Sequence, residues 1–234
     1  MTWSILVRDA ATGALGAAVA SRFFAVGGLC IHIEGQVGAL ATQALVNPLY
    51  AVDGMPRLRA GQSPEAVVAA LVSPDPGRDQ RQLHMIDAQG RIAQHTGPGC
   101  VTWAGQVRAE QVSVAGNMLA GEAVVVATLE GYLAARGSLA ERLLAAMEAG
   151  EAAGGDKRGR QGAGLKICGA DPYPDLDIRA DDHPDPLAEL RRLHRVSLER
   201  YAVFRRHLAS RARPWGELDR TVIDAAIAQE GQPL

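Results

Sequence analysis

The chain has 234 residues, of which 47% are hydrophobic and only 4% aromatic, so it can bury a sizeable core built mainly of small aliphatic side chains. Its 24 basic and 26 acidic residues give a formal net charge of −2, which offers no positive field to attract nucleic acid. The expected partners are therefore a small-molecule substrate and further copies of the chain.

Three cysteines, Cys30, Cys100 and Cys168, lie far apart and form no C-x-x-C pair. This spacing predicts neither a disulfide framework nor a zinc site, and buried apolar thiols are the simpler interpretation. The first twenty residues include Arg8 and Asp9 and lack a long apolar run, so no signal peptide is expected. No stretch approaches the roughly 20 apolar residues of a membrane span. We expect a cytoplasmic protein without membrane contact.

Taken in chain order, alternation and turn signals predict a series of hairpins. Strands are expected at residues 2–8, 14–21, 29–34, 37–44, 82–87, 91–96, 111–115, 163–168 and 176–179. Helices are expected at about residues 48–60, 64–72, 122–136, 138–149 and 184–209. Because short turns join neighbouring strands, an all-parallel doubly wound sheet is excluded, and an α+β fold of layered antiparallel sheets covered by helices is favoured. We assign residues 1–209 to one domain and residues 210–234 to a C-terminal appendage.

Thr2 stands directly behind the initiator methionine, at the start of the first predicted strand. Its small side chain permits a methionine aminopeptidase to remove Met1, which leaves a hydroxyl and a free α-amine on one residue. An α-amine titrates near pH 7.7–8.0, so much of it is neutral at cytoplasmic pH and can act as the general base for the hydroxyl. Threonine is also common at position two without any catalytic role, and the position alone does not decide between these readings.

Short motifs stand out along the chain, namely Thr2-Trp3-Ser4-Ile5-Leu6-Val7-Arg8-Asp9, Thr12-Gly13, Ser21-Arg22-Phe23, Ala41-Thr42-Gln43, Asn47-Pro48, Gly116-Asn117-Met118-Leu119, Gly154-Gly155-Asp156-Lys157-Arg158-Gly159-Arg160-Gln161 and Asp182-His183-Pro184-Asp185-Pro186. Together, and in this order, they resemble a bacterial and archaeal family known as domain of unknown function 1028, over roughly residues 1–200.

That family is grouped with the N-terminal nucleophile hydrolases. The resemblance therefore implies a four-layer αββα sandwich, in which two antiparallel sheets stack face to face and helices cover both outer faces. It also implies that Thr2, once freed at the N-terminus, is the nucleophile that attacks an amide. It implies no particular substrate.

Ser21 and Arg22 end the second predicted strand, which pairs antiparallel with the first. Because the two strands form a tight hairpin, this end must lie near Thr2. Arg22 could lower the pKa of the Thr2 amine or hold a substrate carboxylate, and Ser21 could line the same site. The alternative for Arg22 is a solvated charge at the end of a strand.

Asn117 follows Gly116 at a strand exit, where its amide can donate a hydrogen bond to a developing oxyanion. The alternative is a turn residue that bonds to the local backbone. Thr42 and Gln43 close another strand and could line a substrate at the same sheet edge. A glutamine at such a position more often serves only as a hydrogen-bonding strand residue.

Residues 154–161 form a polar, glycine-rich loop. The loop lacks the G-K-[ST] ending of a P-loop and leads into a strand rather than a helix, so neither nucleotide-binding fingerprint applies. We expect Asp156 to orient the Thr2 amine, and Arg158 and Arg160 to bind an anionic group of the substrate. The alternative is a solvated loop with internal ion pairs.

These observations lead to one hypothesis and two alternatives. The hypothesis is an N-terminal-threonine amidohydrolase that cleaves a small amide through an acyl-enzyme ester of Thr2. No cofactor or metal is expected, since the six histidines show no metal-ligand spacing. The first alternative is a non-catalytic ligand-binding or structural protein on the same scaffold. The second uses Ser21 as an ordinary serine nucleophile, but no G-x-S-x-G elbow surrounds it. The apolar positions of residues 187–198 suit a core or a contact between copies, so a homo-oligomer is expected.

Overall fold

The chain begins with a hairpin of β1 (Thr2–Arg8) and β2 (Leu15–Ser21), as predicted. The computed structural model describes residues 2–231. In it Gly13 closes this hairpin with a φ of 74°, a left-handed conformation that glycine adopts without strain. The register pairs Trp3 with Ala20, so the start of β1 lies beside the end of β2.

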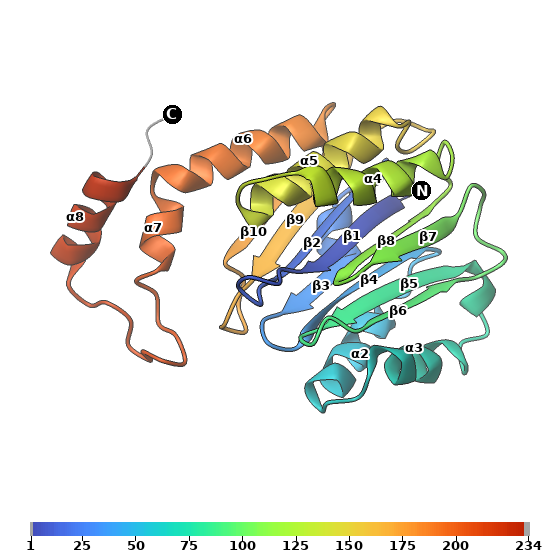
Figure 1. The fold of residues 1–234 in the computed structure, drawn as a ribbon, viewed down its shortest axis with the longest axis horizontal. Coiled ribbons are helices and arrows are strands. Elements are labelled where there is room, and N and C mark those ends of the chain that lie inside the picture. The colour runs from blue at the N-terminus through green and yellow to red at the C-terminus, as the bar shows by residue number, and fades with distance from the viewer. Residues whose placement is uncertain (1, 232–234) are drawn as a thin grey trace.

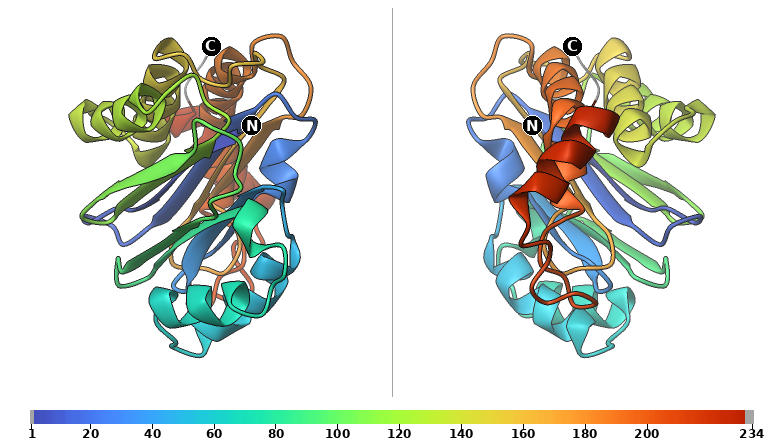
Figure 2. Two further views of the ribbon diagram at one scale, coloured as in Figure 1. Left: turned by 90° about the vertical axis from the view of Figure 1, so that its right-hand side faces the viewer. Right: turned by 90° about the vertical axis from the view of Figure 1, so that its left-hand side faces the viewer.

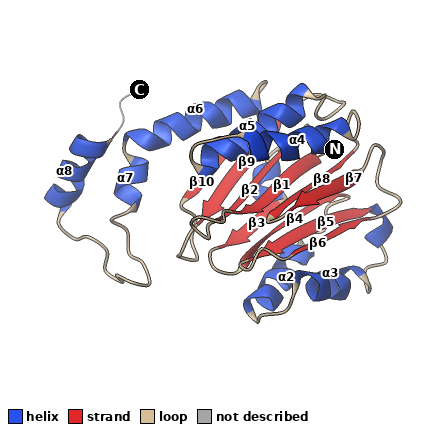
Figure 3. Cartoon of the chain, viewed as in Figure 1, coloured by secondary structure: helices blue, strands red, loops and turns tan. Residues whose placement is uncertain are grey.

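Two antiparallel sheets stack face to face (Figures 1 and 3). One has six strands in the order β10-β9-β2-β1-β8-β7, and the other has four in the order β3-β4-β5-β6. The further strands of the six-stranded sheet are β7 (Gly105–Ala109), β8 (Val112–Asn117), β9 (Gly162–Cys168) and β10 (Leu176–Ala180). The four-stranded sheet contains β3 (Ile31–Glu34), β4 (Gly38–Ala44), β5 (Arg81–Asp87) and β6 (Ile92–Thr96). β1 is therefore an inner strand, flanked by β2 and β8.

Helices cover both outer faces of this pair of sheets (Figure 2). The six-stranded sheet carries α4 (Ala123–Ala134), α5 (Leu139–Ala152) and α6 (Pro186–Glu199). The four-stranded sheet carries α2 (Leu49–Arg59) and α3 (Pro64–Val72). The fold is thus the four-layer αββα sandwich of the α+β class, which confirms the expectation. Within residues 2–231 no helix is long and apolar enough to cross a membrane.

The layer between the two sheets has an apolar half and a polar half. Apolar side chains such as Leu6, Val19 and Ile86 fill one half. The other half, called here the polar half of the inter-sheet layer, consists of the buried side chains of Ser4, Gln43, Gln82, His84, Ser113 and Asn117. Buried polar groups need hydrogen-bond partners, so this half requires a specific arrangement of side chains. This polar half reaches the end of the sheet where β1 begins, because Asn117 pairs with Thr2 there.

Some elements differ from the sequence prediction. The short α1 (Val26–Leu29) and the strand β7 were not expected. The single helix expected at residues 184–209 is wrong, because α6 ends at Glu199 and a separate α7 (Tyr201–Arg205) follows.

The break in this helix has a packing reason. Arg200, at the junction, has a φ of −137°, well outside the helical range. The bend turns α7 onto α8 (Arg220–Glu230), where Val203 is buried with Ile223 and Ile227 in a small cluster of its own. A straight helix would forgo that apolar burial. In Figure 1 this α7–α8 pair stands to one side of the sandwich.

Candidate active site

Thr2 is the first residue of β1, at one end of an inner strand of the six-stranded sheet. Antiparallel pairing places Asn117 of β8 directly opposite it. On the other side the Thr2 hydroxyl donates a hydrogen bond to the Ser21 hydroxyl, with an oxygen–oxygen distance of 3.2 Å. Thr2 is 7% exposed and Ser21 is 2% exposed, so the two hydroxyls meet at a nearly buried sheet end. The hairpin thus brings Ser21 to Thr2.

The Asn117 side chain also lies at Thr2, but its donors are already in use. Its Nδ2 donates to the Thr2 carbonyl oxygen at 3.4 Å and to Gln82 Oε1 at 3.0 Å. An asparagine amide has two hydrogens, and both therefore have acceptors here. A bond from this amide to an oxyanion requires that one of the two be released, and the role of Asn117 in catalysis stays a prediction.

Thr42 and Gln43 are neighbours on β4 but face opposite ways. Gln43 points between the sheets, where its Nε2 reaches Gln82 Oε1 at 2.7 Å and the Thr2 carbonyl oxygen at 3.5 Å. The Thr42 hydroxyl instead donates to the Asn47 carbonyl oxygen at 3.1 Å, just beyond the end of the strand. The structure brings Gln43 to Thr2 and leaves Thr42 on the other face of the sheet.

The polar half of the inter-sheet layer continues inward from Gln43. The Ser4 hydroxyl donates to Gln43 Oε1 at 2.7 Å and lies 2.8 Å from His84 Nε2. On its other side, His84 Nδ1 lies 2.7 Å from the Ser113 hydroxyl. Burial lowers the pKa of His84 from 6.5 to about 3, so the ring is neutral at physiological pH.

The contacts of His84 do not make a catalytic triad, because the ring lies between two serine hydroxyls and has no carboxylate partner among its described contacts. Ser4, His84 and Ser113 are each 0% exposed. No substrate can reach a hydroxyl that is enclosed between two sheets, so Ser4 and Ser113 are not candidate nucleophiles. Through its bond to Gln43, Ser4 helps to hold the side chains next to Thr2.

Asp156 anchors the loop of residues 154–161 to the end of β2. Its carboxylate accepts backbone hydrogen bonds from Arg22 N and Arg158 N, both at 2.8 Å. It also forms a 3.2 Å ion pair with the Arg158 guanidinium. With these partners Asp156 holds Arg22 and Arg158 close to Ser21 and Thr2, and the amine-orienting role expected for it stays a prediction.

Arg160 belongs to a different group of charges. It pairs with Glu151 at 3.3 Å and with Asp185 at 2.9 Å. Both carboxylates lie on or beside helices, at the end of α5 and the start of α6. Arg160 therefore ties the loop to the helical layer through ion pairs outside the loop, and its expected role in binding an anionic group of the substrate stays a prediction.

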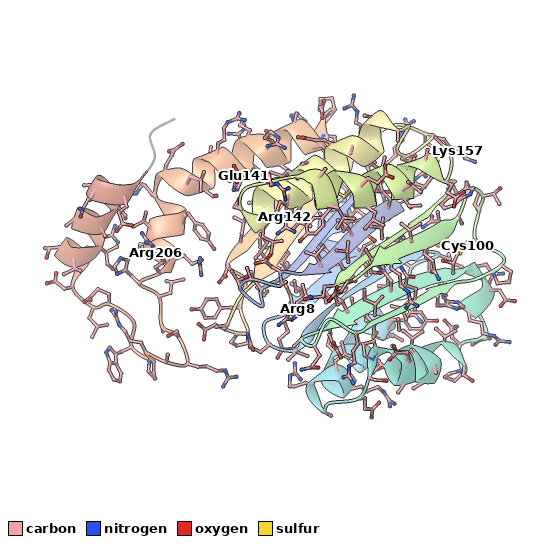
Figure 4. All side chains as sticks on the ribbon, viewed as in Figure 1. Arg8, Cys100, Glu141, Arg142, Lys157 and Arg206 are labelled. Carbon is pink, nitrogen blue, oxygen red and sulfur yellow. The ribbon has the colours of Figure 1, made fainter. Side chains whose placement is uncertain are left out.

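A second loop, at residues 97–104, completes the surroundings of Thr2. Lys157 Nζ donates to the Thr102 carbonyl oxygen at 2.8 Å, and Met118 N donates to the Val101 carbonyl oxygen at 2.7 Å. Figure 4 places Lys157 at the same end of the molecule as Cys100, and the left view of Figure 2 looks onto this end.

Several of these supporting residues were missed in the sequence. The missed residues are Ser4, Gln82, His84, Ser113 and Lys157. A signal was present for three of them, because Ser4 alternates with Thr2 on β1 and Gln82 alternates with His84 on β5. Polar residues at every second position of an otherwise apolar strand indicate one shared polar face.

The larger cavities described for the molecule lie away from Thr2. Cavities of about 530, 420 and 590 Å³ are lined respectively by α2 with α3, by α5 with α6 and α7, and by α3 with β6. None of these three is lined by Thr2, Ser21 or Asn117. Among the residues of the described part of the chain, no group of three or more His, Cys, Asp or Glu side chains could hold a metal ion.

The chain was compared with known proteins. A solved structure from Silicibacter pomeroyi, described as a DUF1028 protein, is 32% identical, with a TM-score of 0.87 and coverage of 94% of this chain and 96% of that one. Weaker likenesses, each at 12% identity, are Anbu (ancestral beta-subunit) from Yersinia bercovieri and eukaryotic HslV from Trypanosoma brucei. Their TM-scores are 0.42 and 0.39, with coverage of 81% and 71% of this chain and 92% and 99% of those chains.

No curated protein matches the sequence. The family model described as "Family of unknown function (DUF1028)" matches residues 2–190. The chain belongs to the DUF1028 family.

Proposed function

We propose that the protein is an N-terminal-threonine amidohydrolase that acts on a small amide. The observation that carries the proposal is the place of the Thr2 hydroxyl. It stands at the first position of an inner strand and is hydrogen-bonded to a second hydroxyl, that of Ser21. Removal of Met1 adds a free amine to the same residue, and the amine supplies the general base that the described side chains around Thr2 do not.

The reaction proceeds in two balanced halves. The amine of Thr2 takes the hydroxyl proton while Oγ1 bonds to the carbonyl carbon of the amide. The carbon–nitrogen bond then breaks, the leaving amine takes the proton, and an ester of Thr2 remains. Water, deprotonated by the same amine, cleaves that ester and restores the hydroxyl.

The neighbouring side chains fix the nucleophile rather than share in the chemistry. Asn117 and Gln43 both donate to the Thr2 carbonyl oxygen, which sets the backbone from which the hydroxyl projects. Ser21 accepts from the hydroxyl and directs its hydrogen. Asn117 becomes an oxyanion donor only if its amide leaves one of its two present acceptors.

The first test concerns the N-terminus of the full chain. An N-terminal threonine with a free amine is a 1,2-amino alcohol, which periodate cleaves with release of acetaldehyde. We expect the purified protein to lack Met1 by intact-mass measurement and to react with periodate, while the Thr2→Ala protein does not react. Retention of Met1 on a protein that hydrolyses an amide would exclude the proposed nucleophile.

A ligand-binding protein on the same scaffold is the second candidate function. It is favoured by the 7% exposure of Thr2 and by the two occupied donors of Asn117. In that case the Thr2→Ala substitution leaves ligand binding intact and no acyl adduct forms on the wild-type chain. Mass detection of an ester on Thr2 during incubation with a panel of amides separates the two candidates.

We also propose that the protein is a cytoplasmic homo-oligomer, with residues 210–234 as an appendage to the main domain. Exposed apolar side chains support self-association through the C-terminal segment, since Trp215 is 68% exposed and Leu218 is 80% exposed. Sedimentation equilibrium of the full chain is expected to give a mass of at least twice 24.7 kDa. The Trp215→Ser and Leu218→Ser double variant should shift the equilibrium toward the monomer, and a monomeric wild type contradicts the proposal.

A further inference from the structure

Four segments are joined through Thr2 into a closed circuit of contacts, and they are called here the site rim: residues 22–24, 101–103, 117–120 and 155–158. Each contact in the circuit is a hydrogen bond. Arg22 N bonds to Asp156, Lys157 Nζ to the Thr102 carbonyl, and Met118 N to the Val101 carbonyl. Thr2 itself closes the circuit through Asn117 on one side and Ser21 on the other. These segments are therefore held together at the end of the sheet where β1 begins.

The site rim carries more positive than negative charge. Its cations are Arg22, Lys157 and Arg158, and its one carboxylate is Asp156, which is paired with Arg158. Arg22 Nη1 and Lys157 Nζ donate only to backbone carbonyl oxygens in the described part of the chain, those of Arg158 and Thr102. These two charges are therefore not neutralised by a carboxylate among residues 2–231.

The site rim also exposes large apolar side chains beside its charged ones. Phe23 is 49% exposed, Phe24 is 63% exposed and Val101 is 51% exposed. Large apolar side chains that stay accessible on segments joined to a candidate site are typical of binding surfaces. The rim thus offers two kinds of contact, a cation for a carboxylate and apolar side chains for a hydrophobic group.

We infer that the site rim binds amides that carry a free carboxylate and a hydrophobic group, such as N-acyl amino acids with apolar side chains. Arg22 and Lys157 hold the carboxylate, and Phe23, Phe24 and Val101 contact the hydrophobic group. That such amides are substrates rests on the proposed function. That the site rim binds them as ligands does not depend on hydrolysis.

The charges of the site rim favour an anionic ligand. An ammonium-bearing ligand would meet Arg22 and Lys157 without a free carboxylate to pair with. A carboxylate can accept hydrogen bonds from both cations.

The test compares two ligands that differ only in charge, N-acetyl-L-phenylalanine and its neutral carboxamide. Binding to the full-length Thr2→Ala protein is followed by titration in NMR spectra, so that no turnover interferes. We expect the acid to bind about fivefold or more tighter than the carboxamide, and this preference to shrink as the salt concentration rises.

The variants locate the preference at the rim. In the Arg22→Gln and Lys157→Gln double variant the two ligands should bind equally, whereas Arg22→Lys with Lys157→Arg should keep the preference. Arg195→Gln, an exposed charge on α6, is the matched control and should change nothing. Thermal unfolding of each variant shows that it is folded.

The outcomes are distinct. A preference for the acid that disappears in the double variant supports the inference, even if Met1 is retained and no amide is hydrolysed, in which case only the proposed function fails. Equal binding of the two ligands by the wild-type rim, no binding of the acid, or a preference that survives in the double variant overturns the inference. Hydrolysis of neutral amides without charge preference overturns it while leaving the proposed function in place.

Discussion

Acidification from pH 6.5 to pH 3 is expected to remove about 5 kcal/mol from the free energy of unfolding through a single buried histidine. The His84 ring is 0% exposed, and burial lowers its pKa from 6.5 to about 3. Between these two pH values the unfolded chain binds a proton at His84 and the folded chain does not. The contribution of His84 to the free energy of unfolding is therefore complete above pH 6.5, and it falls by about 1.4 kcal/mol for each pH unit between pH 6.5 and pH 3.

Urea unfolding at pH 6, 5 and 4 measures this slope. The His84→Gln protein keeps a hydrogen-bonding side chain but has nothing to titrate, so its stability should fall less steeply, by about 1.4 kcal/mol per pH unit. Carboxylates that titrate near pH 4 act equally in both proteins and cancel in the comparison.

Gln94→Met is the matched control for this experiment. Gln94 Nε2 donates to the Ser113 hydroxyl at 3.0 Å, so its loss weakens the same buried group without removing a titratable proton. The variant should be less stable at every pH and keep the wild-type slope. Equal slopes for wild type and His84→Gln would show that the histidine is not kept neutral in the folded protein.

The Thr2→Ala protein is expected to lose about 10⁴-fold or more in kcat on any amide that the wild type hydrolyses, because no other described group at the site carries a free hydroxyl and an amine together. Thr2→Ser keeps both groups and should stay within about tenfold of the wild type. Steady-state kinetics and mass detection of the acyl ester measure the two effects.

Thr12→Ala serves as the control threonine for this series. Thr12 lies in the exposed turn after β1, where its hydroxyl donates to the Asp9 carboxylate at 2.6 Å. Its removal should leave kcat unchanged. Full activity of the Thr2→Ala protein would show that Thr2 is not the nucleophile. The Ser21→Ala protein would then be the next variant to measure.

Most elements of the fold could be predicted from the sequence because their patterns are local. A strand-like run and a glycine-containing turn marked the strands on either side of Gly13, and Ser63 followed by Pro64 marked the start of α3, where the Ser63 hydroxyl accepts from Ala66 N. β7 was missed because its sequence, GQVRA, offers only one large aliphatic side chain, that of Val107, on an edge strand. The break after α6 depends on burial of Val203 against α8, which no local pattern contains.

The sequence was enough to predict which residues lie near Thr2 on the same sheet, but not which hydrogen bonds and ion pairs they form. Antiparallel pairing of two short strands was enough to place Ser21 beside Thr2. The bonds of Asn117 depend on Gln82, a residue of the other sheet, and the stacking of two sheets cannot be read from either strand alone. Arg160 was grouped with Arg158 by closeness in sequence, yet its partners come from two helices.

The polar half of the inter-sheet layer also decides how the two sheets can move. Apolar side chains tolerate small sliding because dispersion contacts have little direction, but hydrogen bonds weaken steeply when their angles change. The single side chain of Gln82, on β5, forms hydrogen bonds with Gly105, Gly116 and Asn117 of the opposite sheet. A shift of the sheets would strain all three bonds together. We therefore expect the two sheets to keep a fixed register beside Thr2, which fixes the position of its hydroxyl relative to the opposite sheet.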